Sequence, residues 1–132
     1  MKVDNILLDA LTAQAQASPH IRMNMDLRNS AADSSQRMLN VLMTDTVIPI
    51  HRHTETSETE IVCRGKVREE FYDVEGNKTA EFVMEAGGEC PGIQIPMGQY
   101  HTLVCLEDGS VIFEAKGRPY DLVKTEDFLV VK

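Results

Sequence analysis

A succession of short apolar segments, each followed by turn residues, restricts the fold of this sequence more than any other feature. "EGN", "GG" and "EDG" lie between segments rich in Val, Ile, Phe and Tyr, and this pattern is typical of antiparallel strands joined by tight turns. No strand–helix alternation suggests a parallel sheet. The sequence therefore predicts an all-β sandwich or barrel. The expected strands span residues 36–43, 46–53, 58–65, 66–74, 78–86, 90–96, 100–106 and 110–116.

The N-terminal part has a different pattern. Residues 4–17 place apolar side chains at helical spacing, and Ser18-Pro19 ends this helix because the residue before proline avoids the α region. Residues 21–27 alternate as a strand does, and the small polar residues 28–35 indicate a loop. We expect one domain over 1–132, divided into an N-terminal helix, strand and loop (1–35), a barrel core (36–116) and a C-terminal segment (117–132).

Composition and charge exclude several classes of function. A net charge of −8 argues against nucleic acid, whose phosphates require clustered Lys and Arg, and it gives no attraction to an anionic membrane. No apolar run reaches the roughly 20 residues of a membrane helix, and the N-terminus does not read as a secretory signal. Three cysteines, two of them in apolar runs, indicate buried free thiols in a reducing compartment. We expect a cytoplasmic protein.

The stretch "PIHRHTETSETEIVCRG" (49–65) contains two of the four histidines. In a strand, His51 and His53 point to the same face and can reach one metal ion. Glu58, on the next strand if residues 54–57 turn the chain, would add a carboxylate. Glu60 shares the strand parity of Glu58 and competes for this role. An H-x-H pair on an exposed strand is also compatible with no metal at all.

A second stretch, "IPMGQYHTLVCL", favours the metal interpretation. Pro96 and Gly98 suit a tight turn that places His101 at the start of an apolar strand. Three of the four histidines thus lie at strand entries, and with one carboxylate they suit a divalent ion such as Fe, Mn, Ni or Zn.

These residues resemble the two cupin motifs. His51, His53, Glu58 and Gly65 match H-x-H-x4-E-x6-G, and Pro96, Gly98 and His101 match P-x-G-x-x-H. The second motif departs at its outer positions, where Cys90 replaces a glycine and Cys105 replaces an asparagine that is often present. Its metal-ligand position is intact.

The likeness extends further, to the WbuC family of cupin-fold metalloproteins. It rests on "SQRMLNVL", "IPIHRH" and "IPMGQYHTLVCLEDGSVIFEAKGRPYD", and covers about Ser18 to Phe128. The resemblance implies a cupin-type double-stranded β-helix, or jelly-roll barrel, with a short N-terminal helix and a metal site of three histidines and one glutamate. It also implies an association with bacterial surface-polysaccharide gene clusters. Cupins often pair through their sheets, so we expect a homodimer.

Strand parity identifies further side chains that face the interior. Gln36 and Asn40 share a face with apolar residues, as in a ligand cavity, although a water-facing sheet edge explains them equally well. Arg64 and Glu114 are also inward candidates, and as buried charges they would need partners, which they could supply to one another. We expect these four residues to bind a substrate.

Two functions agree with such a site, and both bind a small-molecule ligand. One is an enzyme acting on a small polar metabolite such as a sugar derivative, isomerase- or epimerase-like with Glu60 as catalytic base, or Fe(II) oxygenase-like. The alternative is a non-catalytic module that binds a carbohydrate or an organic acid through the metal. A purely structural site ranks last, because structural zinc prefers closed Cys and His sites.

Overall fold

Alternating burial along short segments yields eight strands and one helix in the part of the chain that the structure describes, residues 1–117 and 128–129 of a computed structural model. Most of the expected C-terminal segment, 117–132, lies outside the described residues. The elements are α1 (Asn5–Ala17), β1 (Arg22–Asp26), β2 (Gln36–Leu42), β3 (Glu58–Arg64), β4 (Lys66–Tyr72), β5 (Lys78–Glu85), β6 (Gly92–Ile95), β7 (Tyr100–Cys105) and β8 (Ser110–Lys116).

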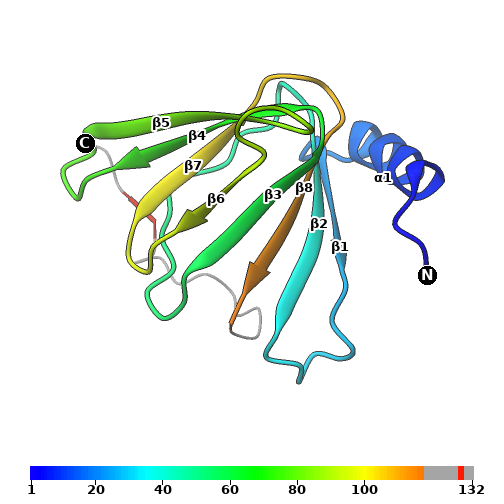
Figure 1. The fold of residues 1–132 in the computed structure, drawn as a ribbon, viewed down its shortest axis with the longest axis horizontal. Coiled ribbons are helices and arrows are strands. Elements are labelled where there is room, and N and C mark those ends of the chain that lie inside the picture. Colours follow the sequence, from blue (N-terminus) through cyan, green and yellow to red (C-terminus); the bar gives the residue numbers. More distant parts are fainter. Residues whose placement is uncertain (118–127, 130–132) are drawn as a thin grey trace.

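The strands form two antiparallel sheets that face each other (Figure 1). The larger sheet has the order β1-β2-β8-β3-β6, and the smaller has the order β5-β4-β7. Because strands adjacent in a sheet are often distant in the sequence, segments from both halves of the chain share one interior. This architecture confirms the predicted all-β jelly-roll barrel with a short N-terminal helix.

The helix α1 covers the outer face of the larger sheet beside β1 and β2 (Figure 1). Its N-terminus is capped by Asp4, whose Oδ1 accepts a hydrogen bond from Leu7 N at 3.0 Å. Leu8, Leu11 and Ala15 are buried against an apolar cluster on β2 and β8. Each buried leucine contributes about 1.5–3 kcal/mol to this packing.

The barrel interior is divided into an apolar half and a polar half. Buried residues of both sheets fill the apolar half: Leu42, Val62, Val67, Met84, Leu103, Cys105 and Ile112. At the other end, cross-strand register places Gln36 opposite Lys116 and Lys116 opposite Glu58. Polar groups therefore collect at the end where β2 and β3 begin and β8 ends.

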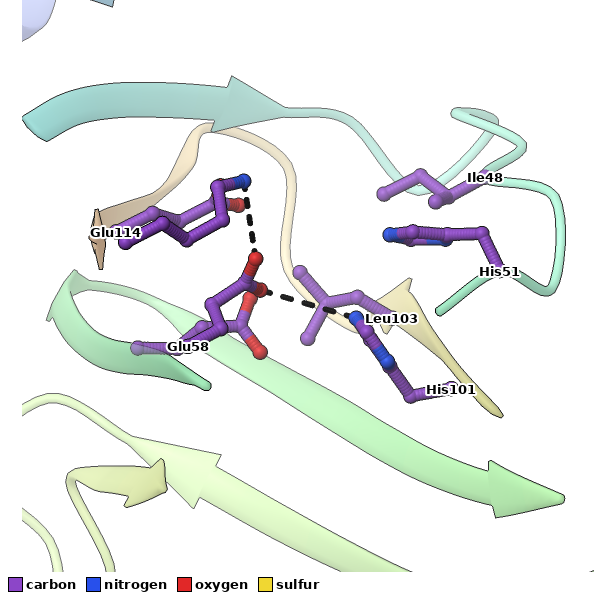
Figure 2. Close-up of a pocket in the computed structure, with 8 residues that line it drawn as sticks. Ile48, His51, Glu58, His101, Leu103 and Glu114 are labelled. Carbon is purple, nitrogen blue, oxygen red and sulfur yellow. Dashed lines mark hydrogen bonds and ion pairs between the residues drawn. The ribbon is translucent and has the colours of Figure 1, made fainter. Parts of the chain in front are cut away.

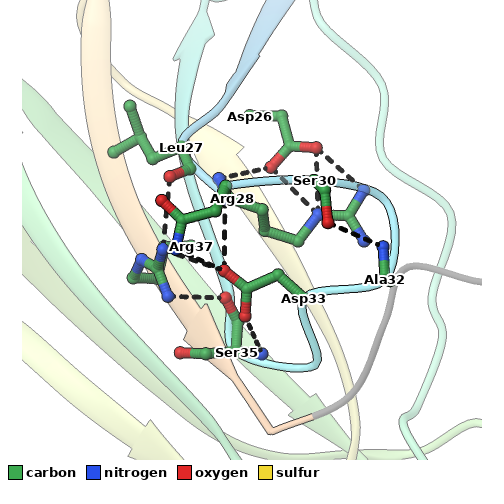
Figure 3. A network of polar contacts seen from close by, with 9 residues as sticks. Asp26, Leu27, Arg28, Ser30, Ala32, Asp33, Ser35 and Arg37 are labelled. Atoms are coloured by element: carbon green, nitrogen blue, oxygen red, sulfur yellow. Dashed lines mark hydrogen bonds and ion pairs between the residues drawn. The ribbon is translucent and has the colours of Figure 1, made fainter.

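The loop between β1 and β2 lies at the same end of the barrel, since β2 begins at Gln36. A network of charged contacts orders this loop (Figure 3). Arg28 donates hydrogen bonds to both carboxylate oxygens of Asp26 at 2.8–3.1 Å, and Arg37 contacts Asp33 at 3.2 Å. Bidentate guanidinium–carboxylate pairing is the geometry that gives such contacts directional specificity.

Two local predictions are wrong. Residues 46–53 do not form a strand: only His51 makes isolated antiparallel bridges, and Pro49 has no N–H to donate to a ladder. The thiols are also not uniformly buried, because Cys63 and Cys90 are exposed and only Cys105 is buried. Local apolar content does not reveal which face of a strand another element covers.

Gly65, between β3 and β4, provides a test of how tightly this corner is packed. Its φ is +83°, and a Cβ at this position would approach Ser110 Cα to 2.9 Å and Ser110 Oγ more closely still. We expect Gly65→Ala to lower the free energy of unfolding by about 2–4 kcal/mol, through left-handed strain and overpacking together. Urea unfolding measures this loss.

Gly87→Ala is the matched control. Gly87 also has a positive φ, +70°, but a Cβ there meets nothing within 4 Å. Its substitution should cost only the backbone strain, about 1–2 kcal/mol. Equal losses in the two variants would contradict the packing argument.

Candidate metal centre

Two backbone hydrogen bonds bring the histidine-rich segment beside β7. His51 N donates to His101 O at 3.0 Å, and His101 N donates to His51 O at 2.8 Å. A third bond, from Gly98 N to His53 O at 2.8 Å, holds the next turn of the segment. The "PIHRH" stretch and the "PMGQYH" stretch therefore meet without the regular strand pairing that the sequence suggests.

The three imidazoles converge. Their ring centroids are 4.4 Å apart for His51 and His101, 5.2 Å for His51 and His53, and 5.6 Å for His53 and His101. One nitrogen from each ring lies within 4.8 Å of the others. Neighbouring ligand atoms on an ion with bonds of 2.0–2.1 Å are about 3–3.4 Å apart, so inward movements of about 1–2 Å would complete a shared coordination shell.

Hydrogen bonds at the other ring nitrogens orient the ligand atoms. His51 Nδ1 lies 2.8 Å from Pro49 O and His101 Nδ1 lies 2.9 Å from Gln99 O. Each carbonyl accepts a hydrogen bond from the protonated Nδ1, which leaves Nε2 with a free lone pair. Nε2 of His53 and of His101 is buried without a hydrogen bond of good geometry.

Burial also keeps the imidazoles neutral, which is the state that binds a metal. Burial, together with the charge of His101, lowers the pKa of His51 to about 4. The pKa of His101 is lowered chiefly by burial. Both rings are therefore unprotonated near neutral pH.

Glu58, at the start of β3, is the carboxylate nearest the imidazoles. Glu58 Oε2 lies 3.0 Å from His53 Nε2, and Glu58 Oε1 lies 3.8 Å from His101 Nε2. Burial raises the pKa of Glu58, but contacts with His53, Lys116 and His101 outweigh burial and hold it below its ordinary value. Figure 2 shows Glu58 and Glu114 facing His51 and His101 across the pocket. Three imidazoles and one ionised carboxylate fit a divalent transition metal.

Glu60 is two residues further along β3 and contacts a different set of groups. Its carboxylate lies close to the carboxylates of Glu58 and Glu114, with one oxygen of each within 4.8 Å of the others. Glu69, from β4 of the smaller sheet, reaches Glu60 across the interior. Burial first, and then the neighbouring carboxylates, raise the pKa of Glu60 well above its ordinary value. Two such carboxyl groups retain a proton between them at neutral pH.

Of the four residues predicted to bind a substrate, three lie in or near the barrel interior and one lies outside it. Glu114 lines the pocket. Gln36 and Asn40 are buried, but they do not line it. Arg64 lies outside the barrel, where its guanidinium contacts Asp9 at 2.8 Å and Asn5 at 2.7 Å of α1.

The inward prediction for Arg64 is wrong because of a β-bulge. The register between β3 and β8 shifts between Val62 and Arg64, so one extra residue interrupts the alternation of side chains. Strand parity counted from Glu58 and Glu60 therefore fails beyond Val62. Glu114 consequently receives its counter-charge from Lys116 and not from Arg64.

Sequence reasoning missed two residues of the polar interior. Lys116 Nζ lies 3.0 Å from Glu58 Oε2 and 3.4 Å from Glu114 Oε2. Its position two residues after Glu114 gives it the same strand parity, and this signal was sufficient to find it. Glu69, completely buried, alternates with Arg68 and Glu70 in a charged run that resembles a solvated face.

The pocket itself is small, and six of its eight lining residues have polar side chains. Its volume is about 50 Å³, and it is lined by Ile48, His51, Glu58, Glu60, His101, Leu103, Glu114 and Lys116. A water needs about 10–15 Å³ on this measure, so the pocket accepts a few non-hydrogen atoms. It suits a small ligand or one end of a larger ligand.

Fold and site together define a jelly-roll protein of the cupin type with a histidine and carboxylate cluster at one end of the barrel. The chain belongs to the family described as "Domain of unknown function (DUF6016)", whose profile matches residues 3–84. A comparison with curated proteins gives no match. Among the described residues, no helix has the length and apolar character needed to cross a bilayer.

Solved structures with the same fold include proteins of diverse names. The capsular polysaccharide assembling protein CapF from Staphylococcus aureus superposes with a TM-score of 0.69 at 18% identity, over 87% of this chain and 33% of CapF. KdgF from Halomonas sp. superposes with a TM-score of 0.58 at 16% identity, over 79% of this chain and 84% of KdgF. Oxalate oxidase in complex with glycolate superposes with a TM-score of 0.63 at 13% identity, over 80% of this chain and 55% of oxalate oxidase. This chain thus spans about a third of the length of CapF.

Glu69 makes the stability of the metal-free protein depend on pH. Burial, with the charges of Glu58 and Glu114, raises the pKa of Glu69 to about 8 from an ordinary value of 4.5. Between these values the folded state holds a proton that the unfolded state has released. Stability therefore falls as pH rises from about 4.5 to 8, by at most about 1.4 kcal/mol for each pH unit. We expect Glu69→Gln to make this slope shallower, because Glu60 still contributes to it, as measured by urea unfolding at pH 5, 6.5 and 8 with chelator present.

The neighbouring Glu70 is a matched control on the opposite face. Burial raises its pKa, but hydrogen bonds from Tyr72, Lys78 and Arg68 outweigh burial and lower it. Its ionised form is the stabilising one, so Glu70→Gln should lose stability at pH 8 relative to the wild type. A Glu69→Gln variant that keeps the wild-type slope would show that Glu69 does not carry this proton.

Proposed function

We propose that this protein is a metal-dependent cupin that binds Fe, Mn, Ni or Zn through His51, His53, Glu58 and His101. The observation that supports this most directly is the convergence of three imidazoles next to an ionised carboxylate, with the Nδ1 atoms of His51 and His101 held by backbone carbonyls. Without an ion, buried Nε2 atoms lack the partners that buried polar atoms normally have. The WbuC resemblance implies the same four ligands.

The proposed activity is chemistry on a small polar metabolite, isomerase- or epimerase-like or Fe(II) oxygenase-like. A bound ion would polarise a carbonyl or hydroxyl oxygen as a Lewis acid. Glu60 lines the pocket and is backed by Glu69, so it is placed to hold or accept a proton beside the ligand. Ile48 and Leu103 supply the apolar part of the pocket wall, which limits access of water.

A sugar or sugar derivative of surface-polysaccharide metabolism is the substrate class we propose. The WbuC resemblance implies this association, and CapF, which shares the fold, is a capsular polysaccharide assembling protein. Glu114, which lines the pocket, and the buried Gln36 and Asn40 behind it would contact the part of such a substrate distant from the imidazoles. A cytoplasmic homodimer remains our expectation for location and assembly.

The second candidate is a non-catalytic module that binds a carbohydrate or an organic acid. The small pocket favours it, because about 50 Å³ holds only a few atoms of a sugar. Incubation of metal-loaded protein with sugars, nucleotide sugars and keto acids separates the two. Ligands that raise the melting temperature but are recovered unchanged support the module, whereas a product supports the enzyme.

Metal analysis of histidine variants tests the proposed centre. His51→Ala and His101→Ala should each lose most bound metal, since each removes one imidazole from the shared shell. His20→Ala is the matched control, because His20 is exposed and its substitution should leave the metal content unchanged. Inductively coupled plasma mass spectrometry of the purified variants gives the stoichiometry. Full occupancy in His101→Ala would contradict the proposal.

The same measurement assigns the carboxylate. We expect Glu58→Ala to lose metal and Glu60→Ala largely to keep it, because the Glu58 carboxylate lies 3.0 Å from His53 Nε2 and 3.8 Å from His101 Nε2. The reverse result would make Glu60 the ligand and Glu58 the partner of Lys116.

A further inference from the structure

Lys116 is the one permanently cationic side chain among the residues that line the pocket. It extends inward from the end of β8, between Gln36 on β2 and Glu58 on β3 in the sheet register. Its side chain is only 10% exposed. A buried ammonium is costly without partners, so its position next to a metal-binding cluster requires an explanation.

Its present partners satisfy only part of its capacity. Lys116 Nζ forms an ion pair with Glu58 Oε2 at 3.0 Å and a long hydrogen bond to Glu114 Oε2 at 3.4 Å. An ammonium has three N–H donors. The carboxylates of Glu58 and Glu114 are the counter-charges of this ammonium.

The oxygen that Lys116 contacts is the same one that faces the histidines. Glu58 Oε2 lies 3.0 Å from both Lys116 Nζ and His53 Nε2. A divalent ion at the proposed centre would neutralise the charge of Glu58. Lys116 would then retain Glu114 as its counter-charge. The ion and Lys116 would be two cationic centres beside one pocket, and an anionic ligand can bridge them.

Resting on the proposed metal function, we infer that Lys116 binds the carboxylate of a small hydroxy or oxo acid, or the acidic end of a sugar acid, held between Lys116 and the histidine cluster. The ammonium supplies a charge-assisted hydrogen bond to the ligand carboxylate. The pocket volume of about 50 Å³ matches a carboxylate with one neighbouring oxygen-bearing carbon. Lys116 thereby selects acids over neutral sugars of the same size.

Calorimetric titration of the Mn²⁺-loaded protein with glycolate and with its neutral isostere glycolamide tests this inference. The wild type should prefer glycolate. Lys116→Met and Lys116→Gln should weaken glycolate binding by about 10- to 100-fold, the effect of losing one hydrogen bond to a charged group, and leave glycolamide binding unchanged. Lys116→Arg should preserve the preference for the acid.

Lys78→Met is the matched control. Lys78 also forms an ion pair with a buried glutamate, Glu70, at 3.0 Å, but it lies on the outer face of the smaller sheet. Its substitution should leave glycolate binding unchanged. Manganese content is measured for every variant, because the inference requires Lys116→Met and Lys116→Gln to keep the metal.

Three results would overturn the inference: equal affinity of the wild type for glycolate and glycolamide, unchanged glycolate affinity in both neutral Lys116 variants, or loss of manganese from them. The last would assign Lys116 to the support of Glu58. A wild type that binds no metal would overturn the proposed function as well. A wild type that binds metal without preferring the acid would overturn this inference alone.

Discussion

The reciprocal backbone hydrogen bonds between His51 and His101 are the interaction on which the site depends. They join a segment without regular secondary structure to the first residues of β7, and so bring two imidazoles from positions 50 residues apart in the chain to a centroid distance of 4.4 Å. Side-chain contacts alone would not hold an irregular segment in register, because each rotamer would be free to turn away. Backbone pairing fixes where each Cβ begins, and the carbonyls of Pro49 and Gln99 then fix the rings.

The polar end of the barrel is arranged as a set of charges that depend on one another. Glu58 contacts both His53 and Lys116, Lys116 also contacts Glu114, and Glu60 faces Glu69 across the two sheets. Such an interior reduces stability, because buried carboxyl groups are desolvated and Glu69 has no hydrogen-bond partner that meets normal geometry. The apolar half of the barrel and the packing of α1 on the outer face offset this cost. The separation of the two halves lets a charged pocket exist inside a stable β-barrel.

The bulge in β3 changes which side chains of this strand point into the barrel. Up to Val62 the alternation of side chains directs Glu58 and Glu60 into the barrel, and beyond it Arg64 turns outward to Asp9 and Asn5 on α1. A residue that regular parity assigns to the pocket thus anchors the helix instead. The cation of the pocket comes from Lys116 on β8, which has no irregularity in its pairing with β2. One extra residue in β3 therefore decides that Lys116 contacts the pocket carboxylates and that Arg64 contacts α1.

The sequence by itself determined the class of fold, the helix, nearly every strand to within a few residues, and the spacing of His51, His53, Glu58 and His101, because these follow from alternation, turn residues and motif spacing along the chain. It did not determine that residues 46–53 lack a strand, that Arg64 leaves the interior, or that Glu69 and Lys116 enter it. Those outcomes depend on which strands become neighbours, on a bulge that shifts the register, and on which faces another element covers. Only the tertiary structure decides these, since the free energy of burying a charge depends on partners that lie far away in the sequence.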